Sequence, residues 1–165
     1  MPQTKVRALK WVGISILSTV VVLTGTFFIA KTSDGPLGPF PGGPLVSGEL
    51  AISAVTDWTF ARETGEIELQ LLQDSSSRTT WLAVANNSAY IPAALDFPPN
   101  KSWHLRAERD GDAQIRFDNT RYPVRLARLD ETSAEFSDVV DVLVATNAMP
   151  PGGKDQMWLF RVSSR

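Results

Sequence analysis

The sequence predicts a mainly β protein of the α+β class: a small antiparallel β-barrel with two flanking helices, preceded by one N-terminal transmembrane helix. Three observations support this prediction. Residues 11–30 form an uncharged apolar run, apolar and polar residues alternate through much of the remaining chain, and two segments break this alternation with helical spacing. A chain of 165 residues has room for one domain and a short appendage, so we expect a single barrel domain at residues 49–165.

The apolar run, residues 11–30, reads "WVGISILSTVVVLTGTFFIA". It has about the length that a helix needs to cross roughly 30 Å of hydrocarbon. The preceding tail, residues 1–10, carries Lys5, Arg7 and Lys10 and no acid, so the positive-inside rule predicts a cytoplasmic basic tail. The sequence therefore predicts a single-pass protein of the cell inner membrane, with its body on the periplasmic or extracellular side.

A cleavable signal peptide is the alternative, because it begins with the same basic and apolar regions. The apolar run is longer than is usual for a signal peptide, and "FFIAKT" offers no pair of small residues spaced for cleavage. We therefore expect an uncleaved anchor that contacts the lipid bilayer through residues 11–30.

Composition excludes several classes of function. From residue 31 on there are 13 basic and 18 acidic residues, and this weakly acidic body predicts no nucleic-acid partner, since such binding needs clustered Lys and Arg. The chain has no cysteine, which excludes disulfides, thiolate metal ligands and thiol nucleophiles.

Residues 31–48 are rich in proline and glycine and include "TSDGPLGPFPGGPLVSG". Such a composition is typical of a linker, and we expect it to mark the domain boundary and to lift the body off the bilayer. Leu37 and Phe40 are the two residues in it that we expect to pack against another surface.

Alternation predicts the strands of the body. Ile67, Leu69 and Leu71 alternate with polar residues, and apolar arms on both sides of Asn86-Asn87-Ser88 predict a hairpin. The first arm is apolar on both faces, with Trp81 and Ala83 on one and Leu82 and Val84 on the other, so we expect cover on both sides. Ile115 and Phe117 lead into a second hairpin through Asp118-Asn119-Thr120, Pro123 is expected at an edge or bulge, and "MWLFRV" predicts the last strand.

Two helices are expected at the flanks of the barrel. Asn100 is a suitable N-cap for a helix from Lys101 to about Arg109. A second helix begins near Thr132 or Ser133, because the apolar residues that follow repeat with helical spacing; they are Phe136, Val139, Val140 and Leu143.

The segments "IELQLLQDSSSRTTWLAVANNSAYIPAA", "KSWHLRAERDGDAQIRFDNTRYPVRLARLDE" and "LFRV" resemble, in order and spacing, the split β-barrel proteins of the pyridoxamine-phosphate-oxidase-like class. The nearest similarity is to the deazaflavin-dependent nitroreductase branch, from about Trp58 to Val162. The resemblance implies a homodimeric split β-barrel that holds FMN or a deazaflavin at the subunit interface and reduces a small substrate by hydride transfer, while the protein orients the cofactor.

Carried over by position, the resemblance implies cofactor-phosphate contacts from Arg78, Thr79 and Thr80. It places Lys101, Ser102 and Trp103 on the helix-start side of the same pocket. The loop "QDSSSRTT" lacks the glycines and the second basic residue that the family often has, and Trp81 stands where a smaller residue is common.

Two functions therefore stay open. One is a membrane-anchored oxidoreductase that uses FMN or a deazaflavin. The other is a non-catalytic binding or assembly subunit that keeps the barrel without a redox cofactor and works beside a membrane protein partner.

The residues identify no catalytic group. His104 is the chain's one histidine and the natural candidate for proton transfer, but we expect it to be solvated or hydrogen-bonded on its helix. No second histidine exists to share a metal, and the nearby acids are typical turn residues, so we expect no metal. The arginines of residues 106–128 interleave with acids, which favours paired surface charges.

Overall fold

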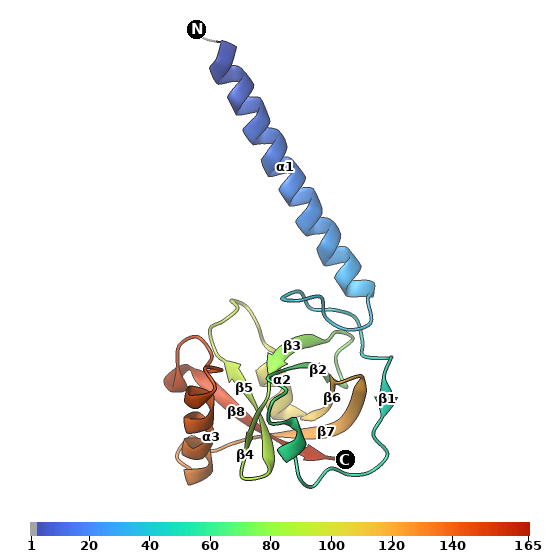
Figure 1. The fold of residues 1–165 in the computed structure, drawn as a ribbon, viewed down its shortest axis with the longest axis vertical. Helices are drawn as coiled ribbons and strands as arrows, with labels where there is room; N and C mark the ends of the chain where they lie inside the picture. Colours follow the sequence, from blue (N-terminus) through green and yellow to red (C-terminus); the bar gives the residue numbers. More distant parts are fainter. Residues whose placement is uncertain (1–2) are drawn as a thin grey trace.

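A computed structural model describes residues 3–165, with side chains described from residue 11 on, so the side chains of Lys5, Arg7 and Lys10 lie outside the described part. Helix α1 runs from Gln3 to Thr32 and projects away from the barrel (Figure 1). Its segment Trp11–Thr32 has a mean hydropathy of 2.2, and its most apolar stretch is not buried against the rest of the protein. The helix is thus long and apolar enough for a membrane anchor, and a signal sequence shares these properties.

The body is a nearly closed antiparallel barrel of seven strands in the order β3-β2-β6-β7-β8-β5-β4. Strands β3 and β4 are the first and last strands of this order, yet a single residue, Leu82, separates them in the chain. One continuous segment therefore joins the two edges of the sheet and nearly closes it, which leaves little free edge for pairing with other chains. The short strand β1 pairs in parallel with β7, off this path. The strand bounds are β1 Glu49–Leu50, β2 Glu66–Leu71, β3 Arg78–Trp81, β4 Ala83–Ala85, β5 Ser88–Ala94, β6 Asp112–Phe117, β7 Thr120–Arg128 and β8 Met157–Ser164.

Both predicted hairpins are present, with turns one residue shorter than expected. Asn86 and Asn87 join β4 to β5 with φ of 48° and 62°, and Asp118 and Asn119 join β6 to β7 with φ of 48° and 58°. Two consecutive positive φ values suit the right-handed twist of the flanking strands, and Asn and Asp tolerate them better than other non-glycine residues.

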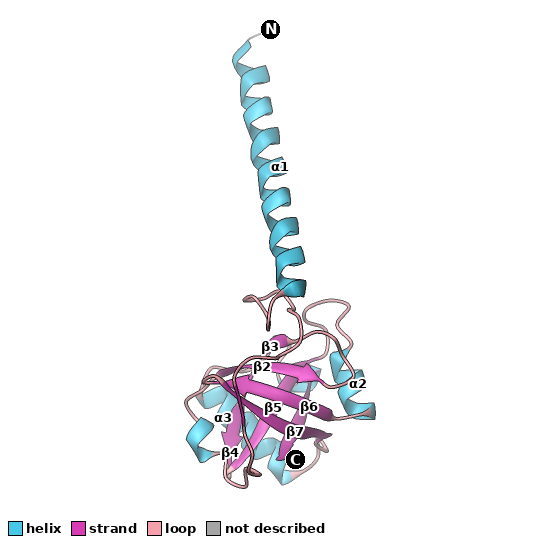
Figure 2. Ribbon diagram, turned by 90° about the vertical axis from the view of Figure 1, so that its right-hand side faces the viewer, coloured by secondary structure: helices cyan, strands magenta, loops and turns pink. Residues whose placement is uncertain are grey.

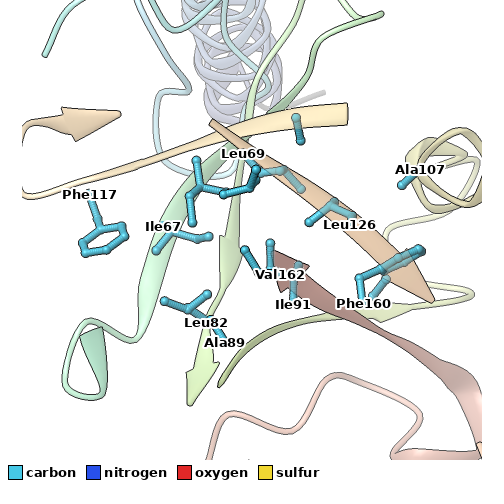
Figure 3. Packing of buried hydrophobic residues seen from close by; sticks show 14 of the residues in the cluster. Ile67, Leu69, Leu82, Ala89, Ile91, Ala107, Phe117, Leu126, Phe160 and Val162 are labelled. Carbon is cyan, nitrogen blue, oxygen red and sulfur yellow. The ribbon is translucent and has the colours of Figure 1, made fainter. Parts of the chain in front are cut away.

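The interior of the barrel is filled with apolar side chains (Figure 3). The expected alternation in β2 is confirmed, because Ile67, Leu69 and Leu71 are at most 2% exposed. Ile115 and Phe160 from β6 and β8 are fully buried beside them. Since the interior is packed, a ligand has to bind on the outside of the wall or at its rim.

The predicted double cover of the strand after Trp81 is also confirmed. Leu82 and Val84 face the barrel interior, whereas Ala83 and Ala85 face outward and pack in a second apolar cluster with α3. Helix α3 runs from Ala134 to Ala145, and Ser133 caps it by accepting a hydrogen bond from the Phe136 amide. Figure 2 shows the two flanking helices on opposite sides of the barrel.

Helix α2 is shorter than predicted and runs from Trp103 to Arg109. Asn100 is not its N-cap, because its backbone is in the left-handed region with a φ of 63° and Ser102 holds the cap position. Lys101 and Ser102 therefore lie in the connecting loop. Two 3-10 turns complete the fold, η1 Thr59–Ala61 and η2 Lys154–Gln156.

The linker is held firmly against the barrel. Leu45 is 1% exposed, its amide donates to Gln70 Oε1 at 2.8 Å, and Gly42 pairs with Ser77 in an isolated bridge. A Cβ on Gly42 would stand 1.7 Å from the carbonyl oxygen of Gly35, so only glycine permits this close approach. Leu37 and Phe40, expected to pack elsewhere, pair with each other across the tip of the loop.

Pro123 lies within β7, at the point where the pairing of that strand changes partner. The residues before it pair with β1, and those after it pair with β8. Proline has no amide to donate, and here it lies between two stretches of pairing on that side of the strand.

Candidate functional site

Two cations from separate parts of the chain converge over one indole. The guanidinium carbon of Arg78, in β3, lies 5.6 Å from the ring centroid of Trp103. The Nζ of Lys101, in the loop before α2, lies 5.8 Å from the same centroid. Both distances fall within cation–π range, so the structure brings together Arg78, Lys101 and Trp103, three of the residues that the resemblance places in one pocket.

A third cation joins them, and a single carboxylate serves two of the three. Arg106 binds Asp74 with two bonds of 2.9 Å, and Arg78 Nη2 reaches the same carboxylate at 3.2 Å. Among the described residues no acid forms an ion pair with Lys101. We call Arg78, Lys101 and Arg106 the cationic cluster; with Asp74 it keeps an excess of positive charge.

Burial and neighbouring charges both lower the pKa values of two of these cations. Burial and, to a lesser extent, the neighbouring charge of Arg78 together lower the pKa of Lys101 to about 8. The pKa of Arg78 is lowered to about 10, mainly by burial; Asp74 offsets part of this shift and Arg106 adds to it. The Nε of Arg78 is buried and has no hydrogen-bond partner among the described residues. An anion placed between these groups would relieve their mutual repulsion.

The three hydroxyl-bearing residues expected at the site do not all lie on the same side of the chain. Ser102 Oγ accepts a 2.8 Å hydrogen bond from Arg106 Nη1 and so belongs to the cluster. Thr80 is half-buried and lies on the same face of β3 as Arg78, because side chains alternate along a strand. Thr79 points to the other face, where its Oγ1 donates to the carbonyl oxygen of Gly38 at 3.1 Å. The structure thus places Thr79 apart from the other predicted residues.

Trp103 forms the floor of the site. It is 5% exposed and its ring packs against Phe160 at 5.7 Å between centroids. Because its inner side belongs to the core and two cations lie over the ring, an aromatic ligand would have to displace a cation before stacking there.

His104 is buried rather than solvated, so that expectation was wrong. It is 6% exposed, its ring meets Trp158 edge-on at 5.1 Å, and its Nδ1 has no hydrogen-bond partner in the described residues. Burial lowers its pKa, and the charge of Lys101 lowers it further. The imidazole is therefore neutral at pH 7 and acts as a packing group.

Arg116 is a feature that sequence reasoning did not single out. It points to the outer face of β6, is 8% exposed, and pairs with Glu68 and, in the linker, with Asp34. Partial burial alone would raise the pKa of Asp34, but hydrogen bonds from Ser47, Val46 and Arg116 hold it well below its ordinary value. The only signal in the sequence was an arginine alternating with Ile115 and Phe117, which does not reveal the partner in the linker.

A shallow open cleft of about 740 Å³ lies beside Arg116. It is a weaker candidate for an anion site than the cationic cluster, because Glu63, Glu66 and Glu68 line it and Arg116 is already paired. No three acidic or histidine side chains within the described part of the chain lie close enough together to hold a metal ion.

Comparison with known proteins adds no family to this description. No known protein family, no curated protein sequence and no solved structure matches the chain. The architecture is a nearly closed antiparallel barrel of seven strands with two flanking helices, and an exposed apolar helix precedes it in the chain.

Proposed function

We propose that this protein is a membrane-anchored split-barrel module that binds a phosphate-bearing ligand in the cationic cluster and acts as a non-catalytic binding or assembly subunit. The observation that carries the proposal is the convergence of Arg78 and Lys101 over Trp103, with a lysine that has no acidic partner among the described residues. Anchoring through residues 11–30 to the inner membrane, with the body on the periplasmic or extracellular side, belongs to the same proposal.

The chemistry of the cluster favours phosphate over other anions. A guanidinium presents paired donors that match phosphate oxygens, and an ammonium adds a compact charge. Ser102 contributes a hydroxyl held beside Arg106. Asp74 already binds Arg106 through both oxygens, and no acid among the described residues pairs with Lys101, so its ammonium group remains for a ligand.

A binding role is favoured over chemistry by the surroundings of the cluster. The one histidine is buried against Trp158, and the interior of the barrel is filled. Near the cluster the described residues offer cations and hydroxyls, which bind anions, and a carboxylate that is committed to two arginines. These groups suffice to hold a phosphate and do not form an acid–base pair.

The second candidate is a reductase that uses FMN or a deazaflavin. It is favoured by one observation: Arg78, Lys101 and Ser102, which the family resemblance assigns to cofactor binding, do lie together. A homodimer would be required on this proposal, because in the resembled family the second subunit completes the cofactor pocket.

The test is thermal melting of the full-length protein in detergent with inorganic phosphate, FMN or neither. A ligand at one hundred times its Kd stabilises the folded state by about 2.7 kcal/mol, so a rise of several degrees in Tm is expected with phosphate. Lys101→Gln should abolish the rise, whereas Lys154→Gln, a change in an exposed lysine of η2, should keep it.

The same experiment separates the two candidates. A rise with phosphate and an equal or smaller one with FMN favours the binding subunit. A much larger rise with FMN, together with a yellow dimer in sedimentation equilibrium, favours the reductase. No rise with either ligand would overturn phosphate binding at this site.

A further inference from the structure

The cationic cluster is tied to the end of the apolar helix through very few bonds. Ser77, the residue before Arg78, donates from its Oγ to the carbonyl oxygen of Gly43 at 2.6 Å. The amide of Gly43 in turn donates to the carbonyl oxygen of Ala30, in the last turn of α1, at 3.1 Å. The position of the cluster along the axis of α1 is therefore set by the fold and not by a loose tether.

That position corresponds to the headgroup layer of a bilayer. The apolar segment Trp11–Thr32 has 22 residues, and at about 1.5 Å per residue it spans roughly 33 Å, close to the hydrocarbon thickness of about 30 Å. The end of α1 thus falls at the edge of the hydrocarbon. Headgroup phosphates lie just beyond this edge, on the side to which Gly43 and Ser77 bring Arg78 of the cationic cluster.

The surface around the cluster fits this location. The loop between β5 and α2, which carries Phe97 and Lys101, lies at the end of the barrel where α1 enters (Figures 1 and 2). Phe97 is 54% exposed there, and Leu37 in the linker is 41% exposed. Exposed apolar side chains beside cations are typical of surfaces that rest on the membrane interface.

We infer that the cationic cluster binds the phosphate of an anionic lipid headgroup in the leaflet from which α1 emerges, so that the barrel docks on the bilayer surface. This inference rests on the proposed phosphate-binding function and names the source of the phosphate. Lipid phosphates are concentrated at this level of the membrane, and the residual positive charge of the cluster is attracted to an anionic surface. Phe97 and Leu37 then insert among the headgroups beside it.

The test uses the full-length chain reconstituted in vesicles. The protein has no cysteine, so Asp96→Cys, at an exposed position of the β5–α2 loop, takes a single fluorophore. Energy transfer from this label to an acceptor on lipid headgroups reports how close the loop lies to the membrane. We expect more transfer in vesicles of phosphatidylcholine with phosphatidylglycerol than in phosphatidylcholine alone.

Charge variants decide whether the cluster is responsible. Lys101→Gln should reduce the preference for anionic vesicles about fivefold, the contribution expected of one cation near such a surface. Lys101→Arg should retain the preference, and so should Lys154→Gln. Equal transfer in the two kinds of vesicle, or a preference that survives Lys101→Gln, would overturn the inference.

Free phosphate separates a failure of this inference from a failure of the proposed function. If inorganic phosphate raises the Tm in detergent while the vesicles show no preference, the site binds phosphate from a soluble ligand and the lipid inference is wrong. If neither effect is seen, both are wrong.

Discussion

At Lys101, binding and folding make opposite demands on a single side chain. Its ammonium group is half-buried near Arg78, which lowers its pKa to about 8. The charged form therefore costs stability at neutral pH, and an anion recovers that cost when it binds. Side chains that destabilise the free protein in this way are frequent at binding sites.

We predict that Lys101→Met raises the free energy of unfolding at pH 7 while it weakens phosphate binding. Between pH 8 and about 10 the unfolded chain binds more protons at Lys101 than the folded protein does, so wild-type stability gains a contribution as pH rises through this window. The variant lacks this gain. Urea unfolding at pH 7 and pH 9.5 measures the difference.

Lys154→Met is the matched control for this prediction, because Lys154 is exposed. Its unfolding should keep the pH dependence of the wild type. If the Lys101 and Lys154 variants respond to pH in the same way, the charge at residue 101 is not the strained group that the structure indicates.

Among the segments of the chain, the linker differs most from what its sequence led us to expect. Its prolines and glycines suggested a free tether, yet the segment contributes Leu45 to the buried core and Asp34 to a cluster with Arg116. Glycine here allows close packing on the barrel rather than flexibility, because the approach at Gly42 leaves no room for a Cβ.

We predict that Leu45→Ala lowers the free energy of unfolding of the barrel by about 3 kcal/mol, the usual cost of emptying a buried leucine site. The adjacent Val46 is 63% exposed, so Val46→Ala should change stability by less than about 0.5 kcal/mol. Denaturant unfolding of both variants makes the comparison. Equal effects would mean that the linker does not fold with the barrel.

For the whole molecule, the decisive relation is between α1 and the barrel. Figure 1 shows the helix leaving the body from one end. The linker joins the two, because Gly43 bonds to Ala30 of α1 on one side and to Ser77, next to β3, on the other. The barrel therefore has one end beside the apolar helix and one end that faces away from it.

We predict that the mature protein retains residues 1–30 and stays in the membrane fraction after alkaline carbonate extraction. The reason is the uncharged helix of sufficient length without a cleavage site of small residues. The intact mass of the purified protein provides the measurement. A protein that begins after Ala30 and remains in the soluble fraction would show that the segment is a signal sequence.

Local sequence patterns were sufficient to predict most helices and strands of this fold. They were insufficient to predict which distant residues contact one another. Alternation at Ile67, Leu69 and Leu71 identified β2, and the Asn86-Asn87 pair identified the β4–β5 hairpin, because each depends on neighbours in sequence. The start of α2 was misplaced, since Asn100 is as suitable for a left-handed bend as for an N-cap.

The sequence by itself determined the apolar helix, the mainly antiparallel barrel and the packed strand after Trp81, because side-chain periodicity and turn chemistry act over a few residues. The grouping of Arg78 with Lys101 came from the family resemblance and not from these local patterns. Only the tertiary structure decided that Asp74 pairs with two arginines while Lys101 pairs with no acid in the described part of the chain, that His104 is buried, and that Asp34 in the linker joins Arg116. These contacts link segments far apart in the chain, where geometry rather than local preference selects the partner. The same geometry links Ser77, next to Arg78 of the cationic cluster, to the end of α1 through Gly43, and the inferred docking on lipid depends on that link.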